Sequence, residues 1–307
     1  MLAVPFICLA DDEDSKDVDD AVEKGSSSEL TLDEIGMELM NPATSMVSFK
    51  TDFHYTFYQG SLADASDESA YVINFQPSFP IPLSNGRNIL LRLNIPLNGD
   101  QPLYEIPGSD KELSTYQIRQ NASTVPQNGT FDNYHGHDHL GEISLDVAYG
   151  GVSDSGIISM FGVKTYFQTN QDFSQSRDQT LFGPDIALGK VTDWGIYGGQ
   201  LTHVTNVQGD KSFDTNMTTL KVFFAYGLGN GWQVFSNPVL AYDWEGDSDN
   251  KLFLPLGAGI AKTTRIGRMP LKLGFEVQKY IVSPDAIGPD WMLTFSITPA
   301  MSNPLKN

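Results

Sequence analysis

The chain has 307 residues, which allows one large domain or two small ones, and its 38 acidic and 19 basic side chains give a formal net charge of -19. This acidity argues against a nucleic-acid binder, which needs a basic surface, and the single cysteine rules out an internal disulfide. No run of about 18 apolar residues is present, so no transmembrane helix is expected, although a barrel strand can cross a membrane with about 9–11 residues of alternating polarity.

The first 29 residues predict export followed by a solvated tail. Residues 1–10 are mostly apolar and end in Cys8-Leu9-Ala10, which has the small-x-small pattern of a cleavage site, so we interpret them as the remnant of a signal peptide. A plain hydrophobic N-terminus is the alternative. Residues 11–29 are strongly acidic, and their self-repulsion predicts a disordered tail.

Residues 30–45 predict a short helix, either on the periplasmic side or inside a lumen. Thr31 is a suitable N-cap, Glu34 follows three residues later as in a capping box, and Pro42 ends the segment. The apolar positions have helical spacing: Leu30, Ile35, Met37, Leu39 and Met40.

From residue 46 to residue 298 the hydrophobic pattern has a period of two. In the first stretch the odd positions from Val47 to Phe57 are mostly apolar, and the even positions from Ser48 to Thr56 are polar. Such alternation gives a strand one apolar and one polar face. Twelve segments share the pattern: 46–58, 70–82, 87–97, 140–150, 156–167, 180–191, 194–206, 217–227, 231–244, 251–263, 270–282 and 290–298.

The connections between these segments alternate in length. The odd-numbered connections are long and polar, whereas the even-numbered ones are tight turns such as Ser84-Asn85-Gly86. Long loops at one end of a meander and short turns at the other are typical of outer-membrane barrels. We therefore expect an all-β fold: an antiparallel up-and-down transmembrane β-barrel of about 12 strands over 46–298, with its apolar face outward, a short N-terminal helix and a C-terminal tail over 299–307. A lipocalin-like barrel or a sandwich is the alternative.

Several short motifs occur in order along residues 36–298: Glu38-Leu39-Met40-Asn41-Pro42-Ala43, Ile73-Asn74-Phe75-Gln76-Pro77, Leu140-Gly141-Glu142-Ile143, Phe182-Gly183-Pro184, Tyr242-Asp243-Trp244-Glu245, Ile266-Gly267-Arg268-Met269-Pro270-Leu271 and Gly288-Pro289-Asp290-Trp291. In these motifs the chain resembles a family of bacterial outer-membrane barrel "transporters" often filed as neuromedin U-like, a neighbour of the MetA-pathway phenol-degradation barrels. The resemblance implies an outer-membrane barrel with a transport role and no catalytic residues.

The polar faces of the twelve segments supply the side chains that we expect to line the lumen. Both signs of charge are present, which suits an open pore whose charges set ion preference as well as a closed barrel whose charges pair across the lumen. The expected lumen-lining residues are Lys50, Asp52, His54, Arg92, Asn94, Glu142, Asp146, Lys164, Asp185, Lys221, Lys272 and Glu276.

A histidine-rich stretch at the end of the longest connection, 98–139, is a candidate metal site. His135, His137 and His139 alternate, so an extended backbone would place three imidazoles on one side, and imidazole suits Zn, Cu or Ni. A polar loop with chance histidines is the alternative. No motif pairs a nucleophile with a base, so we expect no enzyme and no catalytic residues.

These observations predict a passive channel or transporter for a small solute, polar or apolar, in the outer membrane of a Gram-negative bacterium. The expected partners are outer-membrane lipid and lipopolysaccharide, the barrel assembly machinery during biogenesis and the solute, whereas nucleic acid and a bound cofactor are not expected. The alternative is a plugged structural or interaction barrel whose 98–139 loop binds metal or surface partners. A third hypothesis is a lipid-modifying enzyme of the outer membrane.

Overall fold

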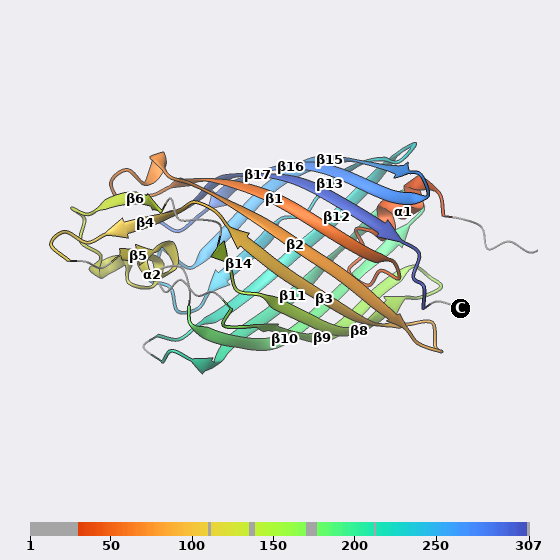
Figure 1. The fold of residues 1–307 in the computed structure, drawn as a ribbon, viewed down its shortest axis with the longest axis horizontal. Coiled ribbons are helices and arrows are strands. Elements are labelled where there is room, and N and C mark those ends of the chain that lie inside the picture. The colour runs from red at the N-terminus through yellow and green to blue at the C-terminus, as the bar shows by residue number, and fades with distance from the viewer. Residues whose placement is uncertain (1–29, 110–111, 135–138, 170–176, 212, 306–307) are drawn as a thin grey trace, which may run out of the picture. The chain divides into compact units, whose positions relative to one another are not determined.

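Twelve antiparallel strands form a closed barrel in the computed structural model (Figure 1), which confirms the predicted fold class. The structure describes residues 30–109, 112–134, 139–169, 177–211 and 213–305. The ninth wall strand is divided into β13 and β14. The wall consists of β1 (Val47–Gln59), β2 (Ser69–Pro82), β3 (Asn88–Asn98), β8 (Ser144–Val152), β9 (Ile157–Tyr166), β10 (Gln179–Thr192), β11 (Gly195–Gly209), β12 (Asn216–Gly229), β13 (Trp232–Ser236), β14 (Val239–Asp243), β15 (Leu252–Ile266), β16 (Met269–Val282) and β17 (Gly288–Met301).

The first and last wall strands pair with each other and close the barrel. Phe53 on β1 lies opposite Phe295 on β17, and their ring centroids are 6.2 Å apart. Closure gives each described wall strand a hydrogen-bonded neighbour on both sides, so the wall presents no free edge for unwanted strand pairing. β17 continues to Met301, beyond the predicted end of the barrel at residue 298.

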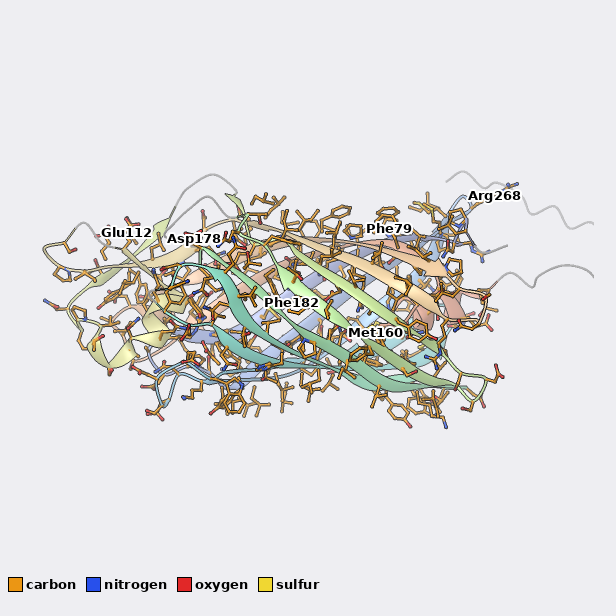
Figure 2. All side chains as sticks on the ribbon, turned by 90° about the horizontal axis from the view of Figure 1, so that it is seen from below. Phe79, Glu112, Met160, Asp178, Phe182 and Arg268 are labelled. Atoms are coloured by element: carbon orange, nitrogen blue, oxygen red, sulfur yellow. The ribbon has the colours of Figure 1, made fainter. Side chains whose placement is uncertain are left out.

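The barrel carries its apolar side chains on the outside and its polar ones inside. On β1, Phe53, Tyr55 and Phe57 are exposed, whereas Asp52 is only 2% exposed. Figure 2 shows side chains projecting outward along the whole wall, with Phe79 and Phe182 among them. This arrangement is the reverse of a water-soluble antiparallel barrel and is typical of barrels that span membranes. None of the helices in the described part of the chain is long and apolar enough to cross a membrane.

The short turns lie at one end of the barrel and the long connections at the other (Figure 1). One short turn, between β12 and β13, has Asn230 and Gly231 at φ 54° and 78°. Positive φ at two successive residues is what a tight hairpin requires, and Asn-Gly is the sequence that accepts it most readily. We call these two ends the short-turn end and the long-loop end.

The predicted helix is present before the first strand, as α1 (Leu32–Glu38), and it begins with the predicted capping box. The Thr31 hydroxyl accepts the Glu34 amide at 3.2 Å, and the Glu34 carboxylate accepts the Thr31 amide at 2.8 Å. The helix packs on inward-facing side chains of the short-turn end: a Cβ on Gly36 would lie 2.7 Å from Thr263 Oγ1, so a larger residue would force Thr263 and Gln233 to shift. α1 therefore occupies the barrel interior.

The longest connection, between β3 and β8, is folded rather than a simple loop. It contains β4 (Gln101–Glu105), β5 (Glu112–Ser114), β6 (Thr130–Tyr134), α2 (Thr115–Gln120), β7 (His139–Leu140) and the 3-10 turn η2 (Ala122–Thr124), and β5, β4 and β6 form a small sheet. We call residues 99–134 the cap. Its Tyr104 and Ile118 are fully buried in one apolar cluster with Ile287, which belongs to the connection before β17. A second 3-10 turn, η1 (Ala65–Asp67), adds Ala65 to this cluster.

Candidate functional site

The barrel interior has an apolar layer at the short-turn end. Met37 of α1 and Met40 just after it pack against buried, inward-facing side chains from opposite parts of the wall. This layer packs against the helix, and the polar side chains of Thr263, Gln233 and Lys272 lie beside Gly36. Its wall members are Leu90, Ala148, Ile158, Met160, Ala187, Ile196, Phe223, Ala225, Phe235 and Ala261.

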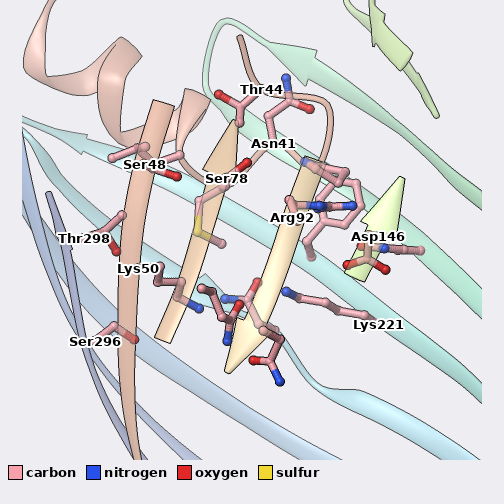
Figure 3. Close-up of a pocket in the computed structure, with 18 of the residues that line it drawn as sticks. Asn41, Thr44, Ser48, Lys50, Ser78, Arg92, Asp146, Lys221, Ser296 and Thr298 are labelled. Carbon is pink, nitrogen blue, oxygen red and sulfur yellow. The ribbon is translucent and has the colours of Figure 1, made fainter. Parts of the chain in front are cut away.

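A cavity of about 370 Å³ lies in the barrel next to the apolar layer (Figure 3). Residues 39–42 and 44, in the connection between α1 and β1, form part of its lining together with side chains from most of the wall strands. The Glu38 carboxylate holds this connector in place, because it accepts the Thr44 hydroxyl at 2.9 Å and the Ser45 amide at 2.6 Å. A volume of this size is near the lower end of the roughly 300–1,000 Å³ typical of small-molecule sites.

The charged side chains that line the cavity are mostly basic. They are Lys50, Arg92, Lys164, Lys221 and Lys272, and among the described lining residues Asp146 is the only acid. The chain as a whole has a net charge of -19, so the cavity has the opposite sign to the protein. In a water-poor cavity such an excess of cations attracts anions more strongly than it would in bulk water.

Three of the basic residues have acidic partners. Lys50 Nζ lies 2.7 Å from the Asp52 carboxylate, and Lys164 Nζ lies 3.5 Å from Asp146. Arg92 lies 3.8 Å from Asp185, which is too long for a hydrogen bond but close enough for a strong charge interaction. These pairs reduce the positive charge of the cavity without removing it.

Two lysines remain without an acidic partner among the described residues. Lys272 donates at 3.1 Å to the Gly36 carbonyl and so links the wall to α1. Lys221, on β12, makes no ion pair in the described part of the chain. Lys221 and Lys50, from different parts of the wall, point into the same space (Figure 3). Because the charge of Lys221 is not offset by an ion pair with any described acid, this space suits an anion.

Of the other side chains proposed for the lumen, those of Asp52, His54, Asp185 and Glu276 lie inside the wall but do not line the cavity. Asp52 accepts the Ser296 hydroxyl at 2.6 Å, and Asp185, which is fully buried, accepts the Thr202 hydroxyl at 2.7 Å. His54 Nδ1 lies 2.9 Å from the Thr294 hydroxyl, and Glu276 accepts the Asn237 amide at 2.8 Å. Asn94 lines the cavity beside Arg92.

Glu142 lies at the long-loop end, between β7 and β8, where it pairs with Arg177 at 3.0 Å. The guanidinium of Arg177 also stacks over Tyr116 of α2, 5.2 Å from the ring centroid. Arg119, on the same helix, lies 5.1 Å from the Phe253 ring, and burial lowers its pKa. Sequence analysis missed these two arginines, because both lie in connections whose backbone path a period-two pattern does not reveal.

The histidine-rich stretch is only partly within the described residues. His135 and His137 lie outside the described residues, and His139 is placed only by its backbone in β7, opposite Asn98. Among the described residues no group of three or more histidine, cysteine, aspartate or glutamate side chains could hold a metal ion. The metal site stays a prediction.

Comparison with known proteins finds similarity only at the level of the fold. No family model and no curated protein matches the chain. An outer membrane channel from Pseudomonas putida F1 superposes with a TM-score of 0.57 and 8% identity, over 85% of this chain and 98% of that one. The NanC porin (TM-score 0.46, 12% identity, 83% and 98%) and the Pseudomonas putida toluene transporter TodX (0.40, 10%, 87% and 93%) are more distant. At such identities the first similarity supports the barrel fold and leaves the solute open, and the two more distant ones carry no argument.

Proposed function

We propose that this protein is an outer-membrane barrel of a Gram-negative bacterium that lets a small solute pass passively through its lumen. The observation that carries the proposal is the reversed polarity of the wall, with exposed apolar side chains outside and a charged cavity inside. A wall of this kind is stable in hydrocarbon, where the closed ladder also satisfies the backbone. The motifs quoted above support membership of the neuromedin U-like barrel family as part of the same proposal.

The lumen charge indicates which solutes pass most easily. Five basic residues against one acidic residue line the cavity, so small anions are favoured over cations of the same size. Because α1 fills one end and the cap folds over the other, the path is narrow, and we expect a lower conductance than that of an open porin.

The test is planar-bilayer recording of the refolded protein in a salt gradient. We expect discrete steps and a reversal potential of the sign that indicates anion preference. Lys221→Gln removes the unpaired cation and should shift the reversal potential toward zero. Lys190→Gln is the matched control, because Lys190 is an exposed residue on the outward face of β10.

A reversal potential that indicates cation preference would refute the role assigned to the cavity charges. If the protein is shown to be folded and inserted but gives no conductance steps, the result would instead favour the second candidate, a plugged interaction barrel. The observation behind that candidate is the cap, which has its own sheet and its own buried cluster around Ile118.

A further inference from the structure

The charged part of the cavity lies on the long-loop side of the apolar layer. On β12 the apolar layer contributes Phe223, and Lys221 lies two residues further from the turn between β12 and β13. On β3 the layer contributes Leu90, and Arg92 lies two residues further from the turn between β2 and β3. Residues two apart on a strand share a face. The apolar layer therefore bounds the cavity toward the short turns, and a solute beside the basic residues meets the polar lining.

Hydroxyl and amide side chains lie next to the two lysines that point into the cavity. Gln76 of β2 lies directly opposite Lys50, and Gln200 of β11 lies directly opposite Lys221. Thr219 precedes Lys221 by two residues on the same face of β12. All of these side chains line the cavity. Each lysine therefore stands beside neutral groups of the kind that can both donate and accept hydrogen bonds.

Some of the hydroxyl and amide groups in this lining have unused hydrogen-bonding capacity. Ser48 and Thr298 are only 8% and 6% exposed, and both line the cavity (Figure 3). Neither hydroxyl has a hydrogen-bond partner within the parts of the chain that the structure describes. The same is true of the side chains of Asn94 and Thr219, which also line the cavity. An unpaired polar group in a buried position is costly, so these groups favour a ligand that supplies their partners.

A ligand that suits this lining carries one negative charge and several hydroxyl groups. Its charge belongs beside Lys221 and Lys50, which point into the same space (Figure 3). Its hydroxyl groups both donate and accept, so they can pair with Ser48, Thr298 and Asn94. A bare hydrocarbon chain would leave these groups unpaired, and a site that bonds a hydroxyl rejects an analogue without one. A neutral polyol would leave the charge of Lys221 without a partner.

We propose that the cavity binds small hydroxylated carboxylates, such as aldonates and uronates, with the carboxylate at Lys221 and Lys50 and the hydroxyl groups on the neutral polar lining. The inference rests on the proposed function, because it names the class of solute that the same lumen admits. The volume of about 370 Å³ suits a small molecule of this kind. Passage also requires that the binding be weak enough for the solute to leave.

The test compares three six-carbon probes by isothermal titration calorimetry of the full chain refolded in detergent. D-Gluconate carries a carboxylate and hydroxyl groups, hexanoate carries the carboxylate alone, and sorbitol carries hydroxyl groups alone. We expect gluconate to bind about tenfold more tightly than hexanoate, because hexanoate leaves the polar lining unpaired. Sorbitol should give no binding. Titration of each probe into empty micelles corrects for partition of hexanoate into detergent.

Two variants separate the contributions of the charge and of the hydroxyl groups. Lys221→Gln should weaken gluconate and hexanoate by the same factor, because both probes carry the carboxylate. Thr298→Val removes a hydroxyl and keeps the shape of the side chain, so it should weaken gluconate several-fold and leave hexanoate unchanged. Thr264→Val is the matched control: Thr263 is fully buried inside the barrel, so its neighbour Thr264 lies on the outward face of β15. Heat-modifiable migration in gel electrophoresis establishes that each variant is a folded barrel.

Two outcomes would overturn the proposed ligand class: hexanoate binding as tightly as gluconate, and no gluconate binding by folded protein. Equal gluconate affinities of the Thr298→Val and Thr264→Val variants would overturn the role of the hydroxyl groups. Calorimetry does not require conduction, so the site and the channel fail separately. Gluconate binding by an inserted protein without conductance would refute the channel and leave the site. An anion-selective current without gluconate binding would refute the site and leave the channel.

Discussion

The bond between Asp33 and Gly231 offers a direct way to release α1 without altering the barrel wall. The Asp33 carboxylate accepts the Gly231 amide at 2.7 Å, and Gly231 lies in the short turn that joins β12 to β13. This bond and the Lys272 contact with the Gly36 carbonyl both join α1 to the rest of the barrel. Replacing Asp33 by alanine removes the first of them and leaves the lumen charges unchanged.

The size of the effect follows from the kind of bond that is lost. A hydrogen bond to a charged group contributes about 1.5–3 kcal/mol. Asp33 is partly exposed, so we take the lower end of this range. Because 1.4 kcal/mol corresponds to about a tenfold change in an equilibrium constant, the population with α1 released should rise about tenfold.

Single-channel recording measures this population as the fraction of time spent at a higher conductance. Asp33→Ala should raise that fraction about tenfold over the unmodified protein, as worked out from the lost bond. Asp193→Ala is the matched control, because Asp193 is an exposed acid in another short turn at the same end. An Asp33→Ala channel that behaves like the control would refute the idea that α1 obstructs the lumen.

Three further outcomes test other parts of the structure. Gly36→Val should expel α1 and raise conductance, since a Cβ at Gly36 would lie 2.7 Å from Thr263 Oγ1. The amide and hydroxyl of Thr31 hold the pKa of Glu34 below its ordinary value of 4.5. The capping box is therefore intact above pH 4.5 and is lost as the pH falls through the lowered pKa. High-conductance events should increase in acid, and they should increase less in Glu34→Gln. Ile118→Ala should cost about 2–5 kcal/mol of cap stability, measured as faster proteolysis of residues 99–134 with the wall still resistant.

The wall strands could be predicted because a barrel with one apolar and one polar face has a strict period of two. Phe53 faces outward and Asp52 faces the interior, and exchanging them would place a carboxylate among the exposed apolar side chains of the outer face. The capping box of α1 could also be predicted, because the side chains of Thr31 and Glu34 bond to the backbone of their own turn. Local chemistry and a regular period are properties of neighbouring residues in the sequence.

The contents of the barrel could not be predicted in the same way. Leu90 is an inward-facing apolar residue that breaks the expected polar face of β3, and its partners come from strands far along the chain. The cap was expected as a plain loop, because β4, β5 and β6 are short and their apolar residues meet only in three dimensions. The basic character of the cavity was also hidden, since the sequence pattern places Asp52, Asp185 and Glu276 on the same inward faces as the lysines, and only the structure shows that these acids do not line the cavity.

The cavity is a consequence of the number of strands. About eight strands enclose an interior that wall side chains can fill, and twelve enclose a wider one. Here α1 supplies the missing volume at one end, and the cap covers the other through Ile118 and its cluster. α1 and the cap do not meet, and the cavity that remains is lined by Lys50, Arg92 and Lys221. The permeability of this barrel should therefore depend on the contacts of α1 and the cap rather than on the diameter of the wall. Variants at those contacts should change the conductance more than any single substitution on the outer face of the wall.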